Sequence, residues 1–143
     1  MKFCLKHLIF VSLDFEQLLP HIVASIDKAD FLAIDCELSG LKVNDEKDNF
    51  FETMEERYLS VRNSTSQFVI IQFGLCPFVY NKETDDYSHE AYNFYTFPRQ
   101  ITSNSPNIRF LCESSSLDFL ASCGFDFNKL IYEGNIYSFN LLI

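Results

Sequence analysis

Tryptophan is absent from the chain, and basic residues are scarce, since 11 Lys and Arg stand against 20 Asp and Glu for a formal net charge of −9. This charge argues against a surface that binds nucleic acid by bulk electrostatics. It leaves room for a narrow nucleic-acid site in which metal cations supply the positive charge locally.

No Cys-x-x-Cys pair occurs among the five cysteines, and their number is odd. This pattern argues against a zinc site and indicates a reduced, intracellular setting, in the nucleus, the cytoplasm or both. No apolar run approaches membrane-spanning length, and no cleavage site follows residues 1–11, so neither a membrane segment nor a signal peptide is expected. With 143 residues, nearly half of them hydrophobic, the composition predicts one globular domain.

The most informative stretch is Ala29–Leu41. Its apolar run, Phe31 to Ile34, is followed closely by a Ser-Gly turn, which predicts a buried, central strand. Side chains alternate along a strand, so Asp35 and Glu37 share one face at a spacing of roughly 6.6 Å.

Two like charges held side by side are unfavourable unless a positive charge neutralises them. Paired divalent cations do this in phosphoryl-transfer sites, and oxygen ligands favour Mg²⁺ or Mn²⁺. The carboxyl end of a central strand is where open α/β sheets keep their sites. On the residues alone, the alternative is that one carboxylate turns to solvent at the strand end.

Periodicity, caps and turn residues predict the remaining elements. The expected helices are Asp14–Lys28, Thr53–Thr65, Ser115–Ser122, and a short one that Asp126 caps and Gly134 ends. The expected strands are Phe68–Leu75, Ala91–Phe97 and Ile108–Cys112, with a hairpin connection over 81–89.

Three residues qualify these expectations. Pro20 means that the first helix is kinked there or begins there. Gly74 marks a bulge or a close backbone approach, and Pro77 limits ladder pairing beyond it. The expected core is a mixed three-stranded sheet with the first two helices packed on it.

Ordered motifs along the chain resemble a known nuclease family. They are Ala29–Leu41, Glu56–Tyr58, Ile71–Cys76, Asn93–Pro98, Ser114–Ser122 and Gly124–Lys129. In this order and at this spacing the chain resembles the poly(A)-specific ribonuclease family, deadenylases of the DEDD superfamily of 3′-to-5′ exoribonucleases. The resemblance implies an α/β, ribonuclease H-like mixed sheet with flanking helices over residues 14–137, truncated before its C-terminal half, with 138–143 as a tail.

The resemblance also implies site residues and partners. Asp35 and Glu37 match the first two metal-ligating carboxylates of a two-Mg²⁺ hydrolytic site. The turn that packs against the terminal nucleotides of the RNA is matched by Leu38, Ser39, Gly40 and Leu41. The implied substrate is a single-stranded RNA 3′ end, either poly(A) or a small RNA, and a homodimer of the parent protein is compatible with the family.

The family's remaining metal ligands, a second aspartate and an Asp-plus-His motif, lie downstream of the matched region. We therefore expect half of a metal site here and an inactive chain in isolation, since helix capping accounts for Asp118 and Asp126. One hypothesis is a portion of a metal-dependent deadenylase or small-RNA trimmer, acting in mRNA decay or RNA 3′-end processing. The others are a non-catalytic short form that binds RNA or a partner, and an unrelated α/β domain with a chance Asp-x-Glu.

Overall fold

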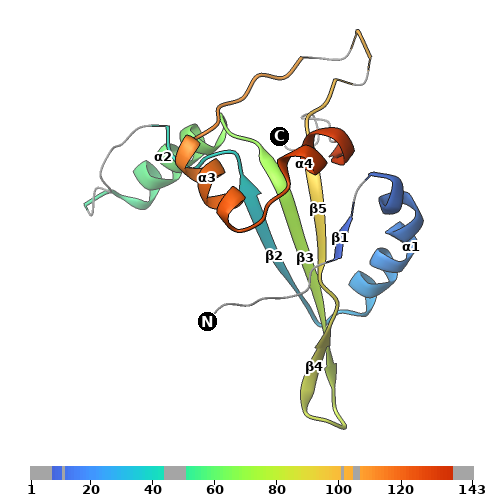
Figure 1. Cartoon of the computed structure of the whole chain (residues 1–143). Helices are drawn as coiled ribbons and strands as arrows, with labels where there is room; N and C mark the ends of the chain where they lie inside the picture. Colours follow the sequence, from blue (N-terminus) through green and yellow to red (C-terminus); the bar gives the residue numbers. More distant parts are fainter. Residues whose placement is uncertain (1–7, 11, 44–50, 101, 105–106, 137–143) are drawn as a thin grey trace.

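The sheet is built around one long strand, β3 (Ile70–Asn81). A computed structural model describes residues 8–10, 12–43, 51–100, 102–104 and 107–136 (Figure 1). Its other elements are β1 (Leu8–Phe10), α1 (Ser12–Lys28), β2 (Phe31–Leu38), α2 (Met54–Thr65), β4 (Asp86–His89), β5 (Tyr92–Phe97), α3 (Ser114–Ser122), α4 (Phe127–Glu133) and β6 (Asn135–Ile136).

Strand order across the main sheet is β1-β5-β3-β2, and Figure 1 shows these strands side by side. β3 pairs antiparallel with β2, β4 and β5, whereas β1 and β6 pair parallel with β5. The three expected main strands are confirmed, but β2, β3 and β5 pair antiparallel with one another, and the described sheet is mixed because β1 and β6 pair parallel with β5. Of the two helices expected on the sheet, α1 packs against it, whereas none of the residues of α2 is buried. β1 and β6 were missed because strands of three and two residues are too short to show a period.

The expectation that β2 is a buried, central strand is wrong for the described residues. β2 lies at the edge of the sheet, with β3 as its one neighbour, and its first five residues are exposed, Ile34 to 62%. An apolar run indicates which side chains favour burial. It does not indicate how many strands flank them, because that depends on distant parts of a polypeptide.

Two clusters of buried side chains cover opposite faces of the sheet. Phe94 packs with Ile22 of α1, and Phe15 meets its ring edge-on at 5.5 Å. The next residue, Tyr95, points to the other face and packs with Leu120 of α3 and with α4. This alternation within β5 places α1 on one face and α3 and α4 on the other.

Several local predictions are confirmed. Thr53 and Glu56 form the expected capping box, in which the Glu56 N–H donates to Thr53 Oγ1 (3.2 Å) and the Thr53 N–H to Glu56 Oε2 (2.8 Å). Asp126 caps α4 by accepting from the Lys129 N–H (2.9 Å). Gly124, with φ of 86°, takes the left-handed conformation expected after α3.

Other local predictions need correction. α1 runs through Pro20, so the helix does not begin there, and β3 continues past Pro77 to pair with β4. α3 begins at Ser114, with Glu113 as its N-cap and no side-chain cap bond, so Ser115 is not the cap. Asp118 lies within this helix, so capping does not account for it as expected.

The expected strand over Ile108–Cys112 is an irregular segment instead. The segment is nevertheless held in place by the Leu111 N–H, which donates to Gln67 O (2.8 Å) in the turn before β3.

Candidate functional site

Asp35 and Glu37 lie on β2, as predicted, and on one face of it. In the ladder with β3, Asp35 is opposite Gly74 and Glu37 is opposite Gln72. Two residues along a strand span about 6.6 Å, so the carboxylates are close enough to share a cation or a cation pair.

The two carboxylates differ in their surroundings. Asp35 is exposed, and its Oδ1 accepts from the backbone N–H of Cys36 (3.0 Å). Glu37 is half-buried, and burial, followed by the charge of Asp35, raises its pKa. Burial and then both carboxylates likewise raise the pKa of the Cys36 thiol. The site is therefore negative and would gain from a bound cation.

Gly74 allows the strands to approach closely beside Asp35. It pairs with Asp35 on one side and Asn93 of β5 on the other. A Cβ on Gly74 would lie 2.9 Å from Asn93 Oδ1 and 3.7 Å from Asp35 Cβ. The expected close approach is confirmed, while the register shift in this ladder lies between Glu37 and Leu38.

Asn93 is a site neighbour that the sequence did not reveal. Its amide oxygen lies over Gly74, on the same row as Asp35 across β2, β3 and β5. Amide and carboxylate oxygens belong to the same hard-ligand class. A single Asn in a strand does not indicate a functional site by itself. Only the pairing register of β2, β3 and β5 shows that Asn93 lies in the same row as Asp35.

The turn after β2 is largely internal. Ser39 is 1% exposed, and its hydroxyl donates to Leu111 O (2.7 Å) and accepts from the Val69 N–H (3.1 Å). Gly40 is also buried, and a Cβ there would clash with the Phe68 ring. Of the four residues matched to the RNA-contacting turn, these two support the turn from within.

The other two residues of the turn reach the surface. Leu41 is 63% exposed and Leu38 is half-buried. Apolar side chains at the end of a strand can pack against an unstacked base. The side chains of Leu38 and Leu41 are therefore accessible to a nucleotide.

The carboxylate oxygens of the site are the kind of ligand that hard cations prefer, but they are too few to complete a metal site. Within the part of the chain that the structure describes, no group of three or more His, Cys, Asp and Glu side chains is placed to hold a metal. Asp35 and Glu37 supply two oxygen-donor side chains, whereas Mg²⁺ takes six ligands and usually keeps several waters.

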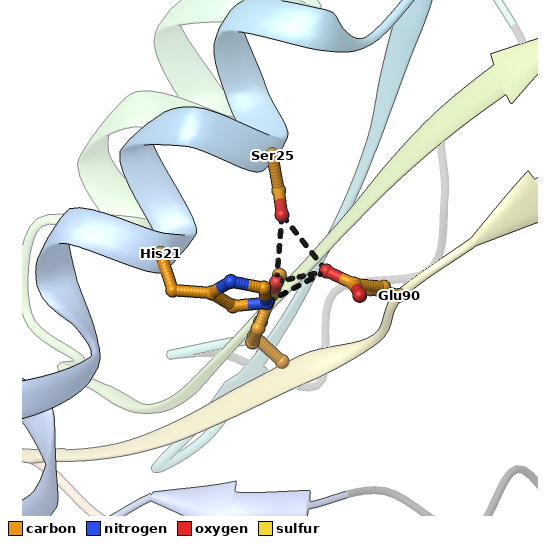
Figure 2. A network of polar contacts seen from close by, with 4 residues as sticks. His21, Ser25 and Glu90 are labelled. Carbon is orange, nitrogen blue, oxygen red and sulfur yellow. Dashed lines mark hydrogen bonds and ion pairs between the residues drawn. The ribbon is translucent and has the colours of Figure 1, made fainter.

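A second polar cluster lies elsewhere on the sheet. Figure 2 shows His21 and Ser25 of α1 reaching Glu90, whose Oε2 also accepts from the Tyr92 hydroxyl. A cavity of about 330 Å³ beside it is lined by residues of α1, β3 and β4 and by Glu90, and by neither Asp35 nor Glu37. This cluster joins α1 to the sheet and is separate from the candidate site.

Comparison with known proteins identifies the class of protein to which this fold and site belong. Residues 11–139 match the model of the CAF1 family ribonucleases. The chain therefore belongs to this ribonuclease family, and the resemblance drawn from its motifs is confirmed.

The chain is also similar to individual curated proteins. Poly(A)-specific ribonuclease PARN is 43% identical in Xenopus laevis and 42% in Homo sapiens, over 127 residues in each case. The pre-piRNA 3′-exonuclease trimmer of Bombyx mori is 35% identical over 120 residues. These matches cover 87%, 87% and 83% of this chain, but 20%, 20% and 22% of the relatives. The chain thus spans about a fifth of the length of these curated relatives.

A solved structure supports the fold. Pop2p of S. pombe, determined in its Mg²⁺- and Mn²⁺-bound form, has a TM-score of 0.64 at 20% identity. The match covers 90% of this chain and 47% of that one. The expected α/β, ribonuclease H-like fold is confirmed. Among the described residues, none of the helices is both long and apolar enough to cross a membrane.

Proposed function

We propose that this chain contributes the first two metal-binding carboxylates of a divalent-metal-dependent 3′-to-5′ exoribonuclease. The substrate would be the 3′ end of poly(A) or of a small RNA. The proposal rests on one observation: Asp35 and Glu37 lie on the same face of β2 in a chain of the CAF1 ribonuclease family. The relatives' names supply the substrate class.

The roles of the side chains follow from their positions. Asp35 and Glu37 would hold the cations, and the Cys36 N–H would orient the Asp35 carboxylate. Leu38 and Leu41 would pack against the terminal nucleotide. When bound, Mg²⁺ would activate water and stabilise the charge that develops on the phosphate oxygens.

We propose further that residues 14–137 correspond to the part of the nuclease domain that carries these carboxylates. Coverage of about half of Pop2p supports this correspondence. An intracellular setting remains part of the proposal. It is supported by the free thiols of Cys36, Cys76, Cys112 and Cys123, since oxidising compartments favour disulfides.

The test is a graft into a complete relative. The matched 127 residues of the Homo sapiens poly(A)-specific ribonuclease are replaced by the corresponding residues of this chain. The graft is expected to shorten oligo(A) from its 3′ end in Mg²⁺, and the isolated chain is not. Asp35→Asn or Glu37→Gln in the graft should each lower the rate by about 100-fold or more, because each removes a group that places transition-state charge.

Asp118→Asn is the matched control, since Asp118 is an exposed carboxylate on α3. It should leave the rate within about twofold of the graft. A Glu37→Gln graft of near-normal rate would remove this residue from the mechanism. Turnover by the isolated chain that Asp35→Asn abolishes would show that further ligands lie within it.

A second candidate function is a non-catalytic form that binds RNA or a protein partner. It is favoured by the exposed apolar side chains of β2, where Phe31 is 47% and Ile34 62% exposed. Such a form would bind a partner through β2 and leave the graft inactive. Recovery of 3′-end shortening by the graft would reject this alternative.

A further inference from the structure

The turn after β2 is held by an irregular segment from far along the chain. Leu111 accepts the Ser39 hydroxyl (2.7 Å), and its own N–H donates to Gln67 O (2.8 Å). Because Gln67 lies in the turn between α2 and β3, this segment links the turn after β2 to the stretch that leads into β3. Leu111 and Ser39 are separated by 72 residues in sequence.

Glu113 binds the same turn at two points. Its backbone N–H donates to Ser39 O (2.8 Å), and its Oε2 accepts from the Leu41 N–H (3.0 Å). The two contacts bracket Gly40, where a Cβ would lie 2.8 Å from Glu113 Cβ. Glu113 can therefore close over the turn only because residue 40 is glycine.

The carboxylate of Glu113 is itself held in place. Ser115 donates to Oε1 (3.0 Å) and Ser116 to Oε2 (3.1 Å). The Leu41 N–H, followed by these two hydroxyls, lowers the pKa of Glu113, so the group stays ionised at neutral pH. Bonds from an ionised acceptor are stronger than bonds between neutral groups.

We propose that Glu113 is a positioning residue that holds Leu41 at a fixed place just after β2, the strand that carries Asp35 and Glu37. Leu41 is 63% exposed, so packing does little to orient it, and its backbone bond to Glu113 provides the restraint. In the proposed function, on which this role for RNA rests, a fixed Leu41 sets where the terminal nucleotide lies relative to the carboxylates. Because a preorganised contact lowers the entropy lost on binding, loss of this restraint should weaken RNA binding and so raise KM.

The first test measures the restraint itself, in the isolated chain. Amide hydrogen exchange at Leu41 is followed by NMR in wild type, Glu113→Ala and Glu113→Gln. Glu113→Ala should speed exchange roughly tenfold, because it removes one charge-assisted hydrogen bond. Glu113→Gln keeps an acceptor oxygen and should recover most of the protection. The matched control is Glu133→Ala, at the exposed end of α4, which should leave Leu41 unchanged.

The second test measures the consequence for RNA in the graft described above. Glu113→Ala should raise KM for oligo(A) roughly tenfold while changing kcat less, and Glu113→Gln should restore KM. Unchanged exchange at Leu41 in Glu113→Ala would overturn the positioning role. Faster exchange with an unchanged KM would overturn its link to RNA. If the wild-type graft is inactive while Leu41 still responds to Glu113, the restraint stands and the proposed function fails.

Discussion

Replacing Glu37 by glutamine is expected to stabilise the metal-free protein at neutral pH. Burial, and then the charge of Asp35, raise the pKa of Glu37, so the ionised side chain is unfavourable in the folded state. Two unit charges about 6.6 Å apart repel by ~0.6 kcal/mol in water and by ~2.5 kcal/mol at an effective dielectric constant of about 20. Asp35 is exposed and Glu37 only half-buried, so solvent and salt reduce the effect to the lower figure.

For a chain of this size, ~0.6 kcal/mol corresponds to a rise in melting temperature of about 2 °C. The gain has a defined pH window. Because the pKa of Glu37 is raised above its ordinary value of 4.5, the wild type loses stability as pH rises through the folded pKa. Below pH 4.5 the carboxyl is protonated in both states, and the variant should have no advantage there.

The assay is thermal unfolding in EDTA at pH 3.5 and pH 7. Glu16→Gln, an exposed glutamate on α1, is the control and should show no gain at either pH. Added Mn²⁺ should raise the melting temperature of the wild type more than that of Glu37→Gln, since the variant lacks one of the two ligands. A lower melting temperature for the variant at pH 7, or the same gain at both pH values, would refute the reasoning.

Three other substitutions test the described contacts. Ser39→Ala should lower the free energy of unfolding by ~1–3 kcal/mol, measured in urea, because it leaves Leu111 O and a buried N–H without their partner; no change would contradict its role in the turn. Glu90→Gln should reduce the loss of folding stability that the wild type shows as pH falls into the acid range. The hydrogen bond from the Tyr92 hydroxyl, followed by that from Ser25, lowers the pKa of Glu90, and this stabilisation is present above pH 4.5 and lost as pH falls through the folded pKa. Gly124→Ala should destabilise by ~1–2 kcal/mol in thermal melts, since φ of 86° strains any residue with a Cβ; an equal melting temperature would show that the backbone adapts.

Local features of this protein were predictable because short-range rules govern them. The alternation of a strand places Asp35 and Glu37 on one face whatever lies around them. The Thr53–Glu56 capping box is complete within four residues, and Gly124 ends its helix through its own backbone freedom. The order and spacing of the motifs likewise identified the family.

Features that depend on distant segments were not predictable in this way. The sequence of β2 resembles that of a central strand, yet among the described residues β3 is its one neighbour. Ser39 was assigned to the RNA-contacting turn, but its hydroxyl is buried against residues 69 and 111. Asn93 and Glu113 join the site through strand register and through a loop, and neither has a local signature.

The amino-acid sequence by itself determined the chemistry of this protein: two carboxylates on one strand face, a following Ser-Gly turn, and membership of a ribonuclease family. Period-two alternation, capping and motif spacing depend on residues close together in the sequence, so they can be recognised without knowledge of the fold. Only the tertiary structure decided which groups surround that strand, which side chains of the turn face solvent, and that Glu113 closes over it. These contacts join residues up to 74 positions apart, as from Ser39 to Glu113, and pairing at that range is set by how the whole sheet packs.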